Sequence, residues 1–297
     1  MAANRQRSRR SGATAPGESG RLAAWSDSDL AAQHRVPAGG KGFHLRDIDP
    51  RDKRALSDRA KAEAAMAVDI ARIDSLQDKL YAEHRRALLC VFQAMDCGGK
   101  DGTIKKVFGP AHPLGLIVTN FKRPTVTELA QDYLWRIHKA MPGRGMIGLF
   151  NRSHYEDVLA VRVHKLVPAA DVERRYDQIN AFEKHLTENG ITILKFYLHI
   201  SKAEQRRRLQ ERIDDPTKRW KFDPADVAER KHWHKYMAAY QIALERCSTP
   251  WAPWYVIPAD RNWNRNAVVA RIVRSTLDDL DPKYPKPDFV PSKVVVK

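Results

Sequence analysis

The stretch MDCGGKDGTIKK, residues 95–106, contains the residue types that can hold a phosphate chain. Proteins often bind phosphate with a tight glycine turn, whose backbone N–H groups face the anion, followed by a lysine and the positive end of a helix. Glycines 98, 99 and 102 supply the predicted turn, Lys100 supplies the cation, and Thr103 begins the predicted helix. We therefore predict a phosphate-binding loop, called the P-loop below (residues 95–102).

This loop departs from the pattern G-x-x-x-x-G-K-S/T at two positions, because Ala94 replaces the first glycine and Asp101 replaces the hydroxyl residue. A carboxylate cannot replace a metal-binding hydroxyl without adding charge, and Asp96 adds a second acid. Since Mg²⁺ prefers hard oxygen ligands, we expect Asp96 to bind it. Asp101 either assists the metal or simply favours the helix N-terminus.

Asn151 and Arg152 follow a predicted buried strand whose end should lie beside the P-loop. Phosphate-transferring proteins with such a loop place an acidic metal ligand at this position. An amide adds no charge, so we expect the metal to depend on Asp96. Arg152 should face the phosphates with its two-pronged guanidinium.

The stretch RRRLQERIDDPTKRWK, residues 206–221, is strongly basic. Its first three arginines, residues 206–208, either form a solvated helix face or contribute to phosphate binding. The sequence Asp-Asp-Pro at 214–216 should end the helix, so that a loop carries Lys218, Arg219 and Lys221. This pattern predicts a mobile lid over the phosphates at about residues 204–224.

Alternating helical and apolar segments must position these groups. Predicted strands cover residues 87–95, 114–121, 145–153, 191–200 and 254–259. Predicted helices cover about 56–86, the start of the P-loop helix near 103, 127–141, 171–190, 201–213, 225–247 and 264–280. Regular alternation of this kind favours an α/β fold, a parallel sheet with helices on both faces.

The chain of 297 residues, 43% hydrophobic, is long enough for one substantial core. We expect a basic disordered tail over residues 1–34, one domain over 35–285 and a C-terminal tail over 286–297. The Arg- and Ser-rich start also has the composition of an organelle transit peptide, an alternative left open.

The net charge of +16 indicates an anionic partner, either nucleic acid, an acidic membrane surface or a polyphosphorylated ligand. Three cysteines without C-x-x-C spacing support neither a disulfide framework nor a cysteine zinc site, so we expect a reducing cytoplasm. No segment approaches eighteen apolar residues, so we expect no membrane span.

Several phrases taken together resemble the polyphosphate kinase type 2 family. DCGGKDGTIK, FKRPT followed by DYLWRIHKAMPGRG, LFNRSHYEDVLAVRVH and RIDDPTKRWKF occur in that family's order and spacing and cover about residues 35–285. The resemblance implies a three-layer α/β/α P-loop kinase fold with a helical lid. It also implies reversible, Mg²⁺-dependent phosphoryl transfer between inorganic polyphosphate and nucleotides, with Mn²⁺ as a substitute ion. Asp101 belongs to the family's own form of the loop.

Matched residue by residue, the resemblance assigns catalytic roles to Asp96, Lys100, Arg152 and Arg212. The metal ligands would be Asp96 and Glu156. The residues expected to bind phosphate and polyphosphate are Gly98, Gly99, Gly102, Thr103, Lys105, Lys106, Arg208, Lys218, Arg219 and Lys221. Lys105 and Lys106 are equally explained as ordinary solvated lysines.

The residues expected to bind the nucleotide are Lys122, Arg123, Pro124, Asp132, Arg136, Asn151 and Glu156. Asp132 and Arg136 lie four apart on a predicted helix, so a simple intrahelical ion pair is an alternative. The wording FNRSHYED resembles the class III branch, whose members use nucleoside mono- and diphosphates. Asn151 stands where some members have aspartate, and Met146 replaces a common glutamate, which leaves local contacts open.

The expected partners are polyphosphate, AMP, ADP, ATP and other purine nucleotides, together with further copies of the chain in a dimer or tetramer. Two other functions remain as alternatives. An ATP-dependent nucleotide kinase would share the fold but ordinarily keeps the G-x-x-x-x-G-K-S/T loop. A basic nucleic-acid-binding P-loop protein would explain the charge but would not need Lys100.

Overall fold

The structure is a computed structural model that describes residues 27–53, 56 and 58–296. Most of the predicted basic tail, residues 1–26, therefore lies outside the described residues. Residues Asp27–His34 form helix α1, which packs near β5 and α11, with Leu30 only 2% exposed. The prediction of disorder is thus wrong for residues 27–34, because they form a helix that packs on the domain and buries Leu30.

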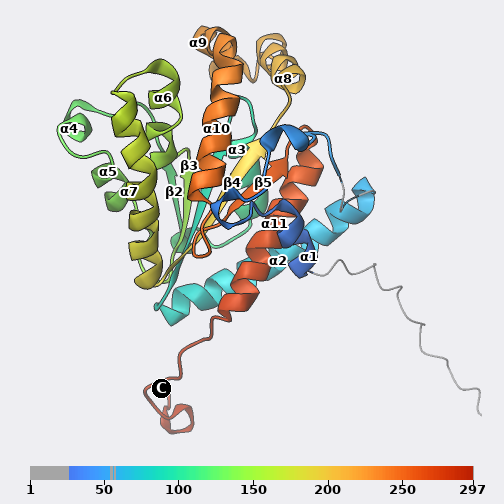
Figure 1. Ribbon diagram of the computed structural model, residues 1–297. Coiled ribbons are helices and arrows are strands. Elements are labelled where there is room, and N and C mark those ends of the chain that lie inside the picture. The colour runs from blue at the N-terminus through green and yellow to red at the C-terminus, as the bar shows by residue number, and fades with distance from the viewer. Residues whose placement is uncertain (1–26, 54–55, 57, 297) are drawn as a thin grey trace, which may run out of the picture.

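Five parallel strands form one sheet in the order β2-β3-β1-β4-β5 (Figure 1). Their bounds are Ala87–Ala94 for β1, Leu116–Asn120 for β2, Ile147–Asn151 for β3, Ile191–His199 for β4 and Trp254–Pro258 for β5. Every residue of the central strand β1 is buried, as expected of a strand covered on both faces. The predicted α/β fold with a parallel sheet is confirmed, and each strand end lies within two residues of its expected position.

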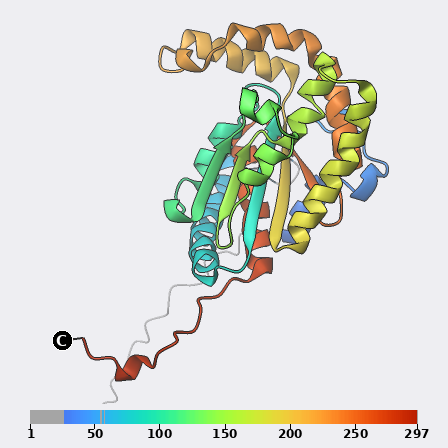
Figure 2. The ribbon, with the colours of Figure 1, turned by 90° about the vertical axis from the view of Figure 1, so that its left-hand side faces the viewer.

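Helices cover both faces of the sheet, as Figure 2 shows. One layer consists of α2 (Arg59–Glu83), α3 (Lys100–Phe108) and α11 (Asn262–Leu280), which pack on one another. The other contains α5 (Trp135–Lys139), α6 (Ala160–His164), α7 (Ala169–Glu188) and α10 (Trp233–Cys247). The carboxyl ends of all five strands therefore meet at one edge, where the P-loop begins.

The helix predicted over residues 127–141 is two short helices, α4 (Val126–Leu129) and α5. The carboxylate of Asp132 accepts hydrogen bonds from the backbone N–H groups of Leu134 and Trp135, at 2.9 and 3.1 Å. A side chain that bonds to the backbone two and three residues ahead competes with a continuous helix. The helix ends before this acid and restarts after it.

The lid rises above the carboxyl edge of the sheet (Figures 1 and 2). It contains α8 (Lys202–Asp214), a 3-10 turn at Arg219–Lys221 and α9 (Pro224–Glu229). The helix predicted over 225–247 is divided by a 3-10 turn at Arg230–His232, and only α10 beyond it belongs to the body. Arg230, in that turn, donates hydrogen bonds to Lys202 O and Gln205 Oε1 of α8, which ties the turn to the lid's first helix.

Beyond α11 the described chain leaves the body, and residues 283–296 are exposed (Figure 1). Cys90, Cys97 and Cys247 are free and buried. In the described part of the chain, no helix combines the length and apolar character that crossing a membrane requires.

Candidate active site

The P-loop connects β1 to α3 and wraps closely around a buried arginine. Gly99 has a φ of 96°, a left-handed conformation that side chains rarely adopt, and a Cβ there would lie 1.9 Å from Arg265 Nη1. Glycine is therefore required at this position for two separate reasons. The helix α3 begins at Lys100, three residues earlier than predicted, so Gly102 and Thr103 lie within the helix and the expected turn role of Gly102 is wrong.

Lys100 is 91% buried at the first turn of α3, and its Nζ donates to the carbonyl of Ala94 at 3.4 Å. Burial, and then the nearby charge of Arg152, lower the pKa of this ammonium, while Asp96, Glu156 and Asp101 oppose the shift. The lysine is thus a desolvated cation beside a second cation. A bound phosphate would restore the interaction that this cation lost on leaving water.

Arg152 joins β3 to the P-loop, since its Nη2 donates to Asp96 Oδ1 at 2.9 Å. Its backbone has a φ of 62°, and its N–H bonds to Phe92 O on β1 at 3.0 Å. A non-glycine residue in this conformation costs about 1–3 kcal/mol, which the surrounding contacts hold in place. Burial acts to lower the pKa of Arg152, but Glu156 and Asp96 outweigh it and raise the pKa. The predicted catalytic groups Asp96, Lys100 and Arg152, with Glu156, are brought together.

Asn151 donates from its side-chain amide to Asp101 Oδ1 at 2.6 Å. Asp101 also lies in the first turn of α3, where a negative charge favours the helix. The contact links the end of β3 to the P-loop helix, parallel to the link between Arg152 and Asp96. This position is consistent with the role at the helix N-terminus, and a role at the metal stays a prediction.

The lid brings Arg212 over the P-loop. Its Nη1 donates to Lys221 O at 2.9 Å and to Asp226 Oδ2 at 3.3 Å. Burial and then the nearby charge of Asp96 raise the pKa of the Asp226 carboxyl to about 6, against the opposing effect of Arg212. Burial likewise raises the pKa of the Cys97 thiol to about 11, opposed by Arg212. A lid acid that sequence reasoning did not single out, Asp226, therefore lies near the P-loop acid.

Arg208 does not have the free guanidinium that a polyphosphate ligand needs. It donates to the backbone carbonyls of Cys97, Ala259 and Asp260, at 3.0, 2.7 and 3.1 Å, and bonds to Glu204 and Asn262. Its side chain is 10% exposed. We therefore correct its role, because these contacts fasten α8 to the P-loop and leave the arginine little capacity for an anion.

Three other predicted lid ligands, Lys218, Arg219 and Lys221, belong to the turn between α8 and α9. Lys218 forms ion pairs with Glu211 and Asp215, at 2.6 and 2.9 Å, and Arg219 donates to Ile213 O. Lys221 lies over the ring of the exposed Trp220. The structure does not bring these cations to the P-loop, and Lys105 and Lys106 are exposed on the outer side of α3.

Some of the residues predicted to bind the nucleotide line a hollow of about 350 Å³ beside the end of β2. Lys122, Arg123 and Arg136 line it together with Glu128. Arg136 is anchored there, because it donates to Lys122 O at 3.0 Å and lies 3.6 Å from Glu128. The alternative ion pair between Asp132 and Arg136 is not formed, because the Asp132 carboxylate accepts hydrogen bonds from the backbone N–H groups of Leu134 and Trp135 instead. Pro124 is exposed beside this hollow.

Sequence reasoning missed three residues that hold the site: Arg265, Gln205 and Asp226. Arg265, 2% exposed at the start of α11, bonds to Asn262 and Asn266 and approaches Gly98 O at 3.5 Å; burial lowers its pKa to about 9. Gln205 donates to Asp96 O at 3.1 Å and accepts from Arg230. These residues and Asp226 stand in ordinary helical surroundings, and no local pattern marks them.

Comparison with known proteins agrees with this site. A family model described as Polyphosphate kinase 2 (PPK2) matches residues 56–285. The AMP/ADP-polyphosphate phosphotransferase of Meiothermus ruber is 49% identical over 266 residues, which cover 89% of this chain and 99% of that protein. The ADP-polyphosphate phosphotransferase of Rhodopseudomonas palustris is 44% identical over 233 residues, which cover 74% of this chain and 81% of that protein.

A solved structure is similar over nearly the same span. The crystal structure of Polyphosphate Kinase 2 from Arthrobacter aurescens TC1 has a TM-score of 0.85 and 44% identity, covering 89% of this chain and 94% of that one. The resemblance predicted from the motifs is confirmed. This chain belongs to the polyphosphate kinase 2 family.

Proposed function

We propose that this protein transfers a phosphoryl group from inorganic polyphosphate to nucleoside mono- and diphosphates, converting AMP to ADP and ADP to ATP, and that the reaction is reversible. One observation carries the proposal: Lys100, Arg152, Asp96 and Glu156 converge beneath a lid that holds Arg212. The relative named as an AMP/ADP-polyphosphate phosphotransferase, which this chain matches along almost its entire length, supports the use of both acceptors.

The protein's part in this reaction is to position phosphates and to stabilise charge. The acceptor is an ionised phosphate oxygen, so no general base is required. Lys100 and Arg152 would contact the transferring group from below, and Arg212 would contact it from the lid, where a water-poor site strengthens each charge interaction. Arg152 is held by its hydrogen bonds to Asp96 and to the backbone of β1, so its side chain needs little rearrangement during the reaction.

Mg²⁺, or Mn²⁺ in its place, belongs to the same proposal. In the part of the chain that the structure describes, no three His, Cys, Asp or Glu side chains are arranged to hold a metal by themselves. Mg²⁺ usually takes one or two carboxylates and completes its shell with water and substrate phosphates; Asp96 and Glu156 are the residues that would hold it here. The ion supplies neutralisation of the charge on the reacting phosphates.

The direct test is incubation of the pure protein with polyphosphate, Mg²⁺ and AMP without ATP, followed by separation of the nucleotides. We expect ADP first and ATP later. If ADP forms only when ATP is supplied as donor, the protein is an ATP-dependent nucleotide kinase and the proposal fails. If only ADP is accepted, the use of both acceptors is wrong, and so is the role assigned to Glu156 in nucleotide binding.

The hollow beside β2 is the proposed place for the acceptor nucleotide, with Lys122, Arg123 and Arg136 facing its phosphate. The net charge of +16 suits a polymeric anion better than one nucleotide. Assembly into a dimer or tetramer stays a prediction. Nucleic-acid binding is the remaining alternative; it predicts salt-dependent DNA affinity that survives Lys100→Met, whereas the proposed transfer does not.

A further inference from the structure

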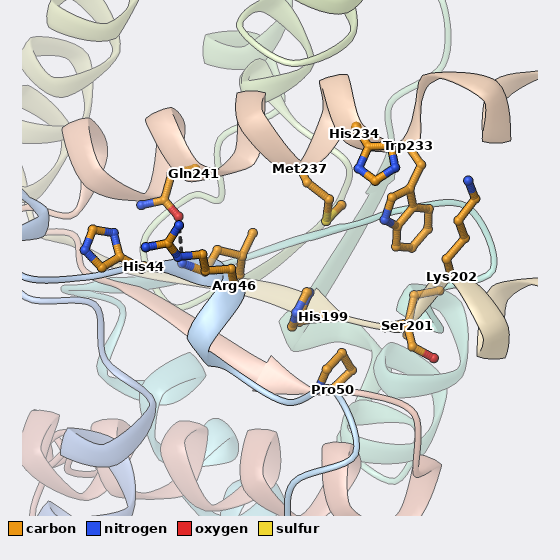
Figure 3. A pocket seen from close by; sticks show the side chains of 12 residues that line it. His44, Arg46, Pro50, His199, Ser201, Lys202, Trp233, His234, Met237 and Gln241 are labelled. Carbon is orange, nitrogen blue, oxygen red and sulfur yellow. Dashed lines mark hydrogen bonds between the residues drawn. The ribbon is translucent and has the colours of Figure 1, made fainter.

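A separate cavity of about 570 Å³ lies behind the lid, away from the P-loop cluster. It is bounded by the segment 44–50, the carboxyl end of β4 and the first residues of α8 and α10, and we call it the hinge cavity. Figure 3 shows Trp233, His234 and Met237 on α10 facing His199 and Pro50, with Ser201 and Lys202 at one end and His44 and Arg46 at the other. Its volume is that of a small-molecule site.

Both chain segments that carry the lid line this cavity. Ser201 and Lys202 stand where α8 leaves the sheet, while Trp233 and His234 stand where the lid returns into α10. Hydrogen bonds tie the α8 hinge and the α10 wall to the body: Ser201 donates from its backbone N–H and its hydroxyl to the two carboxylate oxygens of Asp260, each at 2.8 Å, and Gln241 Oε1 accepts from the Leu45 N–H at 2.6 Å. A ligand in this space would therefore touch the body and both hinges of the lid at once.

The lining selects a class of ligand. Trp233, Met237, Leu45 and Ile200 give it an apolar body. Of the twelve described residues that line it, none is acidic, and Lys202 and Arg46 place positive charge at its two ends, although Arg46 also lies 3.7 Å from the exposed carboxylate of Asp47. An apolar slot beside an indole ring suits a flat aromatic body, and cations at the ends favour an anionic group.

His199 adds a polar side chain to the lining, and one of its ring nitrogens has no hydrogen-bond partner within the described part of the fold. It is 7% exposed, and its Nδ1 has no hydrogen-bond partner among the described residues. Burial lowers the pKa of this imidazole to about 4, although a hydrogen bond with the backbone of Ile48 opposes the shift. The ring is thus neutral at neutral pH, and a buried polar nitrogen without a partner is costly unless a ligand or water supplies one.

A short chain of contacts leads from the cavity to the P-loop. Lys202 O and Gln205 Oε1 both accept from Arg230, at 3.2 and 2.8 Å, and Gln205 donates to Asp96 O at 3.1 Å. Asp96 in turn accepts from Arg152. A shift of the α8 hinge relative to α10 would therefore be transmitted to the backbone of the P-loop acid.

We propose that the hinge cavity is a regulatory binding site for a planar aromatic molecule with one anionic group, separate from the sites for nucleotide and polyphosphate. Because the ligand contacts both hinges, its binding favours the lid position of this structure and slows the lid movement that each turnover requires. The bound ligand should therefore inhibit turnover, and raising the concentration of nucleotide or polyphosphate should not reverse the inhibition.

The test uses 1-anilinonaphthalene-8-sulfonate, an aromatic monoanion, with the full-length protein. Its fluorescence should report one bound equivalent that persists when saturating AMP and polyphosphate occupy the active site. Met237→Trp, which fills the cavity, should weaken this binding by at least about tenfold. Val68→Trp, at an exposed position on α2, is the matched control and should leave it unchanged.

A second pair of variants tests the charge without disturbing the core. Arg46→Glu, on a side chain that is 83% exposed, should weaken binding of the probe several-fold. Arg51→Glu makes the same charge change on a nearby side chain that does not line the cavity, and it should have little effect.

Rates complete the experiment. The probe should lower wild-type turnover at saturating substrates and should have no such effect on Met237→Trp. Displacement of the probe by substrates, equal binding by Met237→Trp, or unchanged wild-type turnover would each overturn the proposal. The binding readout does not depend on the proposed phosphoryl transfer, so failure of that activity and failure of this site remain distinguishable.

Discussion

Arg152 Nη2 lies 2.9 Å from Asp96 Oδ1, and this contact fixes the end of β3 against the P-loop. The two residues are 56 positions apart in the chain, and they meet because β1 and β3 are parallel neighbours whose carboxyl ends coincide. The pair holds a cation at the floor of the site in one orientation. It is the structural basis of the first prediction.

Arg152→Ala should lower kcat with polyphosphate and AMP by about 10²–10³-fold, the cost of removing one preorganised charge donor from a site of this kind. Arg152→Lys should recover only part of the loss, since an ammonium lacks the two-pronged geometry. The measurement is the initial rate of ADP formation. Arg85→Ala removes the same charge at an exposed position two residues before β1, at the opposite edge of the sheet, and should retain wild-type turnover. Equal losses in the two variants would show that net charge, not position, matters.

Gly99→Ala should abolish activity and lower the melting temperature, because the added methyl group meets Arg265 and the backbone has a positive φ. Gly102→Ala is the matched control. Its Cβ would lie 3.6 Å from Arg265 Nη2, an ordinary contact, and alanine is better than glycine within a helix by about 1 kcal/mol. Thermal unfolding and turnover should therefore separate the two variants. A tolerated Gly99→Ala would mean that the loop differs from the one described.

Lys195→Met should lower the free energy of unfolding by about 3–5 kcal/mol, because it leaves the carboxylate of Glu183 buried without its main partner. Lys195 Nζ lies 2.5 Å from Glu183 Oε2, and neither side chain is more than 1% exposed. Burial acts to raise the pKa of Glu183, and Lys195 and His154 outweigh it and lower the pKa. Urea denaturation measures the loss.

The double variant Lys195→Met/Glu183→Leu serves as the control for this pair. Removing both charges should restore a large part of the stability, since no buried ion is left alone. A double variant as unstable as Lys195→Met would instead assign the loss to packing around Tyr155, whose hydroxyl bonds to both side chains.

His199 should make the protein less stable as pH falls from about 6.5 towards 4. Burial lowers the pKa of this imidazole from 6.5 to about 4, so the unfolded chain binds the proton first. The stability linked to His199 is complete above pH 6.5 and is lost progressively to about pH 4, by about 3 kcal/mol in total. His199→Gln should flatten that part of the profile of unfolding free energy against pH, whereas the exposed His185→Gln should not. An unchanged slope in His199→Gln would contradict the assigned shift.

The site residues that the sequence predicts correctly are those marked by a pattern in their own stretch of the chain. Lys100 follows a glycine turn between an apolar strand and a helix, and Arg152 stands at a strand end, so fold rules alone place both at the same edge. Arg265 and Gln205 stand on helices far along the chain from Lys100. No sequence pattern near either residue indicates a contact with the P-loop. Their roles depend on packing between distant segments.

Charge alone also led to errors that the structure explains. Arg208 has the charge and geometry of a phosphate ligand, but its guanidinium donates to backbone carbonyls of the P-loop and of the segment after β5. Asp132 has helical spacing to Arg136 but bonds to the backbone ahead of it and breaks the helix. In both cases a competing hydrogen bond, invisible in the one-dimensional pattern, determines the outcome.

The central claim is that one cluster around Lys100 moves phosphoryl groups from polyphosphate to nucleotides. The most direct measurement compares wild type and Lys100→Met for the rates of ADP formation from AMP and of ATP formation from ADP, each with polyphosphate as sole donor and with circular dichroism to verify folding. We predict that wild type supports both conversions and that both rates fall together by at least about 100-fold in the variant. A folded Lys100→Met that keeps either rate would contradict the account.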